Sequence, residues 1–251
     1  AESIKALNAL FKHQADPSSI AGIIIEPVQG EGGFNIAPAD FMQALRALCD
    51  EHGILLIADE IQTGFARTGK MFALEHMGVT ADVVTLAKGL AGGFPLSAIV
   101  GRAEVMDAAA PGGLGGTYAG NPVACAAAHT VLDIIAEENL CVRADAIGEI
   151  IRSRCRELAS RSNLACIGDV RGLGAMCAVE FVKDVTSGEP APELTAEVLK
   201  AGNARGLILL SCGTSGNVIR FLPPLTASDE IVKEGMDLFE ASLTDAVAKL
   251  Q

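Results

Sequence analysis

Three charged residues stand directly after apolar runs in the first part of the chain. Glu26 follows a run of isoleucines, Asp59 follows residues 54–58 (ILLIA), and Lys88 follows residues 83–87 (VVTLA). Short runs made mostly of apolar residues are typical of buried strands in a parallel sheet. Ligands of such sheets bind beyond the carboxyl ends of the strands, so we expect the three side chains to project toward one crevice.

A lysine and an aspartate at such an edge can serve one chemistry. Partial desolvation, expected at Lys88, favours a neutral amine that attacks an aldehyde. The carboxylate of Asp59 can keep a pyridine nitrogen protonated, so that the ring withdraws electrons from a carbanion. The Gly92-Gly93 pair lets the backbone approach a bulky ligand. The alternative, that these charges are caps or surface groups, stays open on spacing alone.

The elements that must position these residues follow from the apolar periodicity. Residues 38–52 form an amphipathic helix pattern, with Pro38 suited to its first turn and Gly53 to its C-terminal cap. Strands are expected at residues 20–25, 54–58, 83–87 and 97–100. The alternation of strand and helix predicts an α/β fold with a mostly parallel sheet.

The second part of the chain has a looser pattern. Helices are expected at residues 121–138, 144–160, 193–205 and 228–250, and strands at residues 176–182, 207–210 and 218–222. This mixture predicts a small α+β domain. We place the boundary in the turn near residue 143, which gives a large domain over residues 1–142 and a small C-terminal domain over residues 143–251.

Composition excludes several classes of protein. The formal net charge of −12 repels nucleic acid and anionic membranes, and no apolar run is long enough to span a bilayer. Residues 1–12 form an amphipathic helix pattern rather than a signal peptide. The seven cysteines include no C-x-x-C pair and the four histidines lack ligand spacing, so we expect core cysteines, a reducing cytoplasm and no metal site.

Five sequence blocks resemble one family of enzymes. They are residues 26–33 (EPVQGEGG), 59–69 (DEIQTGFARTG), 88–95 (KGLAGGFP), 115–122 (GGTYAGNP) and 168–174 (GDVRGLG). Their types and order resemble the class III aminotransferases, which are pyridoxal-phosphate enzymes of fold type I. Within that family, residues 112–118 (GGLGGTY) and 206–213 (GLILLSCG) most resemble the 4-aminobutyrate aminotransferases.

The resemblance implies a role for four residues at the cofactor. Lys88 forms a Schiff base with pyridoxal 5′-phosphate and then moves the proton between substrate and cofactor carbons. Asp59 pairs with the pyridinium nitrogen, and Gln62 hydrogen-bonds the phenolic oxygen. Thr117 binds the phosphate of the neighbouring subunit's cofactor, which makes a homodimer part of the mechanism. The alternative for Thr117 is a turn residue between glycines.

A second group of residues concerns the substrate. Arg220 stands alone in the apolar run of residues 218–222, which is costly unless the guanidinium is paired. Its partner is either a carboxylate of the protein or a substrate carboxylate held by two hydrogen bonds. The resemblance implies that Glu31 pairs with Arg220 when an ω-amino acid is bound and swings away to admit glutamate or 2-oxoglutarate. Glu26 helps to position the same network.

The resemblance thus implies ping-pong transfer of the amino group of 4-aminobutyrate to 2-oxoglutarate, giving succinate semialdehyde and glutamate. One alternative is another ω-aminotransferase, acting on ornithine, acetylornithine, 5-aminovalerate or a β-amino acid. Another is an inactive fragment that serves only in folding or dimerisation. Family members are longer, and the segment expected before Ala1 carries a phosphate-binding loop, a stacking aromatic ring and a second arginine. We therefore expect residues 1–251 alone to bind the cofactor weakly and to lack transaminase activity.

Overall fold

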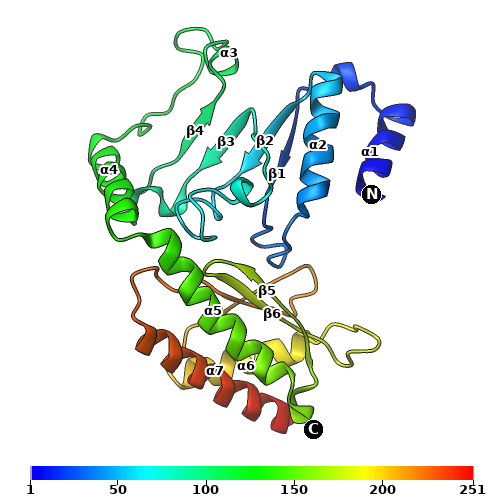
Figure 1. Ribbon diagram of the computed structural model, residues 1–251, viewed down its shortest axis with the longest axis vertical. Coiled ribbons are helices and arrows are strands. Elements are labelled where there is room, and N and C mark those ends of the chain that lie inside the picture. The colour runs from blue at the N-terminus through cyan, green and yellow to red at the C-terminus, as the bar shows by residue number, and fades with distance from the viewer. Residues whose placement is uncertain (1, 251) are drawn as a thin grey trace. The chain divides into compact units, whose positions relative to one another are not determined.

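The structure is a computed structural model that describes residues 2–250 (Figure 1). The chain forms two compact units. The first unit comprises residues 2–28, 36–65 and 70–138, and the second comprises Gln29–Asn35, Ala66–Gly69 and residues 139–250. Two short segments from the first part of the sequence thus belong to the second unit. The division of the chain into domains at residue 143 stays a prediction.

The first unit is built on a four-stranded sheet in the order β1-β2-β3-β4 (Figure 1). Its strands are β1 (Gly22–Ile25), β2 (Leu55–Asp59), β3 (Val83–Leu86) and β4 (Ala98–Gly101). β1 pairs with β2 and β2 with β3 in parallel, whereas β4 pairs with β3 in antiparallel. The predicted α/β class and mostly parallel sheet are therefore confirmed, and each predicted strand lies within two residues of the observed one.

Helix α2 (Ala39–His52) connects β1 to β2 and covers one face of the sheet. It begins after Pro38 and ends at Gly53, whose φ of 66° is the left-handed conformation of a C-terminal cap. Its apolar side buries Met42 and Leu45 against Leu56 of β2. Burial of each such side chain stabilises the fold by about 1.5–3 kcal/mol. Alternate residues of β2, Asp59 among them, point to the opposite face.

The remaining elements of the first unit are short except for two helices. They are α1 (Glu2–His13), η1 (Pro17–Ser19), η2 (Ala73–His76), η3 (Lys88–Ala91), α3 (Ala103–Met106) and α4 (Pro122–Glu137). Ala1, which was expected in the first helix, lies outside the described residues. Asn121 caps α4 by accepting hydrogen bonds from the backbone N–H groups of Val123 and Ala124 at 2.9 and 3.3 Å.

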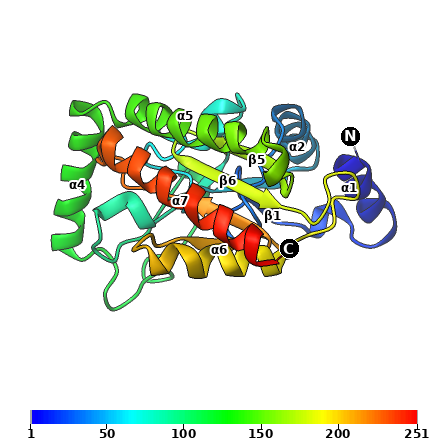
Figure 2. The ribbon, with the colours of Figure 1, turned by 90° about the horizontal axis from the view of Figure 1, so that it is seen from below.

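The second unit is an antiparallel sheet packed against helices, as the α+β prediction required. The sheet has the order β5-β6-β8-β7, and its strands are β5 (Ile167–Leu173), β6 (Met176–Phe181), β7 (Leu210–Cys212) and β8 (Val218–Phe221). The helices are α5 (Leu140–Ala159), η4 (Ser162–Leu164), α6 (Pro192–Ala204) and α7 (Asp229–Leu250). α7 packs against both α5 and α6 (Figure 2).

The second unit differs from the sequence-based expectation in three details. β5 was not expected, because it contains Gly168, Asp169 and Gly172, residues that strands disfavour, yet it pairs with β6. The strand expected at residues 207–210 is displaced to β7, because the N–H of Leu207 is used to cap α6 at the carbonyl of Gly202. The helix expected from residue 144 begins at Leu140.

No helix among residues 2–250 is both long and apolar enough to cross a membrane. The same residues contain no group of three or more His, Cys, Asp or Glu side chains arranged to hold a metal ion. The seven cysteines form no disulfide, and Cys49, Cys155, Cys177 and Cys212 are buried. Burial raises the pKa of the Cys177 and Cys212 thiols to about 11 in each case.

Candidate functional site

The parallel pairing places three of the predicted site residues at the same edge of the first unit's sheet. Glu26 directly follows β1, Asp59 is the last residue of β2, and Lys88 lies two residues beyond the end of β3. The register pairs Ile25 with Ala58, and Asp59 with Thr85. The carboxyl ends of these strands are where ligands bind in open α/β sheets.

Lys88 is held in an unusual backbone conformation. Its φ of 46° lies in the left-handed region, which costs a residue with a side chain about 1–2 kcal/mol. It begins η3, which ends at Gly92, also in the left-handed conformation. Strain of this kind, when the surroundings hold it, is concentrated at functional sites. The desolvation expected of Lys88 is not found, because its side chain is exposed to solvent.

Asp59 and Thr85 are partners across β2 and β3 on the face of the sheet opposite to α2, and Gln62 follows Asp59 by three residues. Asp59 is half-buried, and its Oδ1 accepts a hydrogen bond from the N–H of Ile61 at 3.1 Å. The side-chain oxygens Oε1 of Gln62 and Oγ1 of Thr85 are buried, and none of residues 2–250 supplies a hydrogen-bond partner for them. Buried polar atoms are nearly always paired, so these two oxygens are suited to a polar ligand.

Sequence reasoning missed Thr85 and Glu60. The signal for Thr85 was a polar residue inside an otherwise apolar run. Glu60 is fully buried, and its carboxylate accepts hydrogen bonds from the Thr63 hydroxyl and from the N–H groups of Ala73 and Leu74, the latter two at 2.9 Å. These bonds fix the turn that carries Asp59 and Gln62 to the start of η2.

In the sequence, Thr117 is remote from the residues at this sheet edge. It belongs to the connection between α3 and α4, where residues 107–121 are all exposed. The glycines Gly112 and Gly120 in this connection have positive φ values of 78° and 66°. The structure does not assign Thr117 to either of its two predicted roles, as a phosphate ligand or as a turn residue.

The second unit brings together Arg220 and Glu31. Arg220 lies in β8 between Ala178 of β6 and Leu210 of β7. Its Nη1 forms an ion pair with Oε1 of Glu31 at 2.5 Å. The Arg220 side chain is only 13% exposed, whereas that of Glu31 is 77% exposed. Loss of the partner of a buried charge costs about 3–5 kcal/mol, so Arg220 requires either Glu31 or a replacement carboxylate.

A further donor of Arg220 has no partner in the described part of the chain. Its Nε is buried without an acceptor. A guanidinium has five N–H donors in a rigid fork, so the single oxygen of Glu31 leaves most of the fork available. Glu26 belongs to the first unit, and its predicted place in the Arg220 network stays a prediction.

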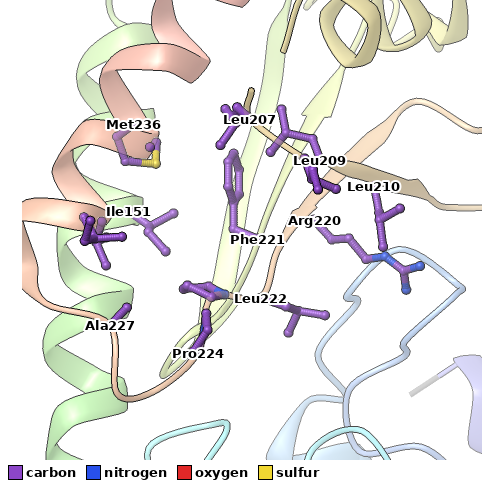
Figure 3. A pocket seen from close by; sticks show the side chains of 15 residues that line it. Ile151, Leu207, Leu209, Leu210, Arg220, Phe221, Leu222, Pro224, Ala227 and Met236 are labelled. Carbon is purple, nitrogen blue, oxygen red and sulfur yellow. The ribbon is translucent and has the colours of Figure 1, made fainter. Parts of the chain in front are cut away.

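An apolar cavity of about 350 Å³ lies next to Arg220 within the second unit (Figure 3). Side chains from α5, α7 and the strand β8 line it, among them Ile151, Phe221 and Met236. Arg220 is the only charged residue in the described lining, and Figure 3 shows its guanidinium pointing away from Ile151 and Met236. Arg220 therefore lines one side of the cavity, and its charged group is directed away from the apolar side chains of Ile151 and Met236.

Comparison with known proteins gives one consistent result. A family model described as aminotransferase class-III matches residues 1–243. The 5-aminovalerate aminotransferase DavT of Pseudomonas aeruginosa is 53% identical over 94% of this chain and 55% of its own length. The 4-aminobutyrate aminotransferase GabT of Escherichia coli is 51% identical over 98% of this chain and 57% of its own length.

Solved structures agree with these relatives. A transaminase from the marine bacterium Virgibacillus superposes with a TM-score of 0.92 at 31% identity, over 100% of this chain and 58% of its own. The ornithine aminotransferase of Toxoplasma gondii superposes with a TM-score of 0.86 at 34% identity, over 98% of this chain and 55% of its own. The chain thus spans little more than half the length of the relatives that it matches.

Proposed function

This chain belongs to the class III aminotransferase family, and we propose that the protein containing it transfers the amino group of 4-aminobutyrate to 2-oxoglutarate. The products are succinate semialdehyde and glutamate. The observation that carries the proposal is the place of Lys88, a strained lysine at the strand edge that also presents Asp59. The identity of 51% to a 4-aminobutyrate aminotransferase supports the choice of reaction.

The residues at this edge fit pyridoxal 5′-phosphate. The cofactor's ring nitrogen and phenolic oxygen require a carboxylate and a hydrogen-bond donor, for which we propose Asp59 and Gln62. The amide of Gln62 has a buried polar atom without a partner among the described residues. Rotation of that amide about its last bond presents N–H donors at the same position. The buried Thr85 hydroxyl offers a further donor on the same face.

Each residue then has a defined task. Bound pyridoxal phosphate supplies an aldehyde that takes up the amino group and a ring that withdraws electrons. Lys88 would hold the cofactor's aldehyde carbon through Nζ, with loss of water, and as a free amine it would carry the proton between substrate and cofactor carbons. The carboxylate of Asp59 keeps the ring nitrogen protonated. We propose that Thr117 binds the phosphate of the partner subunit's cofactor, so that two subunits share their active sites in a homodimer, and that this enzyme is cytoplasmic.

Arg220, Glu31 and Glu26 distinguish the two substrates. 4-Aminobutyrate has one carboxylate, remote from its amine, whereas glutamate has a second carboxylate beside its amine. With 4-aminobutyrate bound, Glu31 stays on Arg220 and the guanidinium keeps its partner. With glutamate or 2-oxoglutarate bound, the α-carboxylate replaces Glu31. The high exposure of the Glu31 side chain supports this exchange, because the displaced carboxylate moves into water.

A second candidate is transfer from 5-aminovalerate, since the relative DavT is 53% identical to this chain. The two donors differ by one methylene, which a pocket distinguishes by only about 1–3 kcal/mol. We therefore propose to compare kcat/KM for 4-aminobutyrate, 5-aminovalerate and ornithine, with 2-oxoglutarate as acceptor, in the complete protein. We expect the highest value of kcat/KM for 4-aminobutyrate. A higher value for either rival reassigns the donor, and no transfer from any of the three refutes the proposed function.

A further inference from the structure

The segment Gln29–Asn35, which carries Glu31, is fixed to the second unit through its backbone. The carbonyl of Glu31 accepts a hydrogen bond from the N–H of Gly213 at 2.9 Å. The carbonyl of Gly33 accepts two hydrogen bonds from Arg171, from Nε at 2.9 Å and from Nη2 at 2.6 Å. The main chain is therefore held at Glu31 itself and again two residues further on, at Gly33, and the Glu31 side chain reaches Arg220 from this fixed segment.

Arg171 is itself fixed in place. It lies in β5, its side chain is 13% exposed, and its Nη1 forms ion pairs with Asp169 at 2.7 Å and with Glu180 at 2.6 Å. All three guanidinium nitrogens are thus engaged, two on one carbonyl and one on two carboxylates. A planar fork of this kind restricts the position of its acceptor more than a lysine ammonium does.

The local packing leaves little space for the segment to shift. Gly33 has a φ of 112°, and a Cβ there would lie 3.2 Å from the Cα of Gly213 and 3.4 Å from Nη2 of Arg171. The next residue, Phe34, is fully buried. As long as Gly213 holds the backbone of Glu31 and Arg171 holds that of Gly33, the Glu31 carboxylate therefore moves away from Arg220 mainly by rotation of its side chain.

We propose that Arg171 is a positioning residue that sets the preference of the site for an ω-amino acid over an α-amino acid. By holding the backbone at Gly33, Arg171 keeps the Glu31 carboxylate within reach of Arg220. This favours the paired arrangement that a substrate with a single carboxylate requires. A loosened segment weakens the pair, and Arg220 is then more often available to an α-carboxylate. This inference rests on the proposed function and assigns to it a residue outside the substrate contacts.

The test compares Arg171→Lys with Arg152→Lys in the complete enzyme. Arg152 is a matched control, because its side chain is 14% exposed and its Nη1 donates to the carbonyl of Gly174 at 2.8 Å, away from Glu31. The quantity measured is the ratio of kcat/KM for 4-aminobutyrate to kcat/KM for glutamate. We expect this ratio to fall about tenfold in Arg171→Lys, on the scale of one hydrogen bond to a charged group, and less than twofold in Arg152→Lys.

A binding experiment without turnover also measures the preference between ligands with one and with two carboxylates. Calorimetry with glutarate and butyrate should show a shift of relative affinity toward glutarate in Arg171→Lys. In a Glu31→Gln background the Arg171→Lys change should add no further shift, because its effect passes through Glu31. If Arg171→Lys does not fold, Asp169→Asn, which removes an exposed partner of Arg171, should lower the same ratio to a smaller extent.

An equal fall of kcat/KM for both substrates in Arg171→Lys would show a purely structural role and overturn the inference. An unchanged ratio, or an undiminished effect in the Glu31→Gln background, would overturn it as well. Failure of the wild-type enzyme to use 4-aminobutyrate at all is a different result, since it counts against the proposed function.

Discussion

The buried carboxylate of Glu60 is the single residue that we expect to fix the turn carrying Asp59. The change Glu60→Gln replaces one acceptor oxygen by an N–H group that meets the N–H of Ala73 or Leu74. We expect the loss of one buried hydrogen bond to lower the free energy of unfolding by about 1–3 kcal/mol. The turn that carries Asp59 should loosen, so cofactor affinity should fall and the near-ultraviolet circular dichroism of the bound cofactor should change.

Glu75→Gln is the matched control for this prediction. Glu75 lies in the same η2 and accepts a hydrogen bond from the N–H of Phe72 at 2.8 Å, but this bond is exposed. We expect a change in unfolding free energy below about 0.5 kcal/mol and an unaltered cofactor spectrum. Equal effects of the two substitutions would show that the burial of Glu60 does not fix the turn.

The sequence indicated part of this site because of where apolar runs end. A charged residue that directly follows an apolar run, such as residues 83–87, can be recognised from the sequence alone. Lys88 and Asp59 were identified in this way. Two of the three partners of Glu60, the N–H groups of Ala73 and Leu74, lie more than ten residues further along the chain, so no local pattern reveals them. The exposure of Lys88 and its left-handed φ likewise depend on tertiary structure, which periodicity does not encode.

Among the elements of the first unit, Asp82 connects strand β2, helix α2 and the residue that follows β4. Its buried carboxylate accepts hydrogen bonds from the N–H of Leu56 at 2.8 Å, from Arg46 at 2.6 Å and from Arg102 at 3.0 Å. Burial by itself raises the pKa of Asp82, but the N–H of Leu56 and the two guanidinium groups outweigh it and hold the pKa below its ordinary value.

The lowered pKa of Asp82 predicts a pH-dependent contribution to stability. The contribution is fully present above the unfolded-state pKa of about 3.9 and is lost as the pH falls through the lower folded-state pKa. We expect Asp82→Asn to lower the free energy of unfolding by about 3 kcal/mol at pH 7. Urea unfolding from pH 7 down to pH 3 should show the wild type and the variant converging in acid. A difference between them that does not depend on pH would contradict this explanation.

The elements that sequence analysis misplaced are those whose sequence conflicts with their final pairing. β5 contains two glycines and an aspartate, and it is a strand because β6 supplies a partner. Residues 207–209 are apolar enough for a strand, yet Ile208 is 83% exposed and β7 begins only at Leu210. Strong periodicity placed α2 and α7 to within one residue, since burial along a helix follows the sequence directly.

At the scale of the whole molecule, the proposed sharing of Thr117 predicts complementation between subunits. Lys88→Ala removes the covalent attachment of the cofactor, and Thr117→Ala removes a phosphate contact that we assign to the partner's site. A hybrid dimer of the two variants contains one site with both residues intact. An equal mixture should therefore recover about a quarter of the wild-type sites, because half of the dimers are hybrids with one intact site each.

The measurement is transaminase activity at limiting cofactor after the two variants are unfolded and refolded together. The same variants refolded separately and then combined are the control. Activity no greater than that of the control would place Thr117 at the active site of its own subunit, or outside any active site.

The two compact units are not continuous in the sequence, so their composition cannot be predicted from the order of the elements alone. Gln29–Asn35 and Ala66–Gly69 belong to the second unit although the chain reaches them at least seventy residues before Asn139. The backbone of Arg67 accepts a hydrogen bond from the N–H of Ala175 at 3.0 Å. Contacts of this kind join positions that are far apart in the sequence. A prediction with a single boundary near residue 143 does not include short segments of the first part that belong to the second unit.

Reductive trapping of the cofactor shows whether Lys88 is the lysine that holds pyridoxal 5′-phosphate. The complete protein is saturated with pyridoxal 5′-phosphate, treated with borohydride, digested, and its peptides are weighed by mass spectrometry. Borohydride converts the carbon–nitrogen double bond at Lys88 into a stable amine, so the account predicts a phosphopyridoxyl group on the peptide that contains Lys88, and none in Lys88→Ala. A Lys88 that remains unmodified at cofactor saturation, with the group on another lysine or on none, would contradict it.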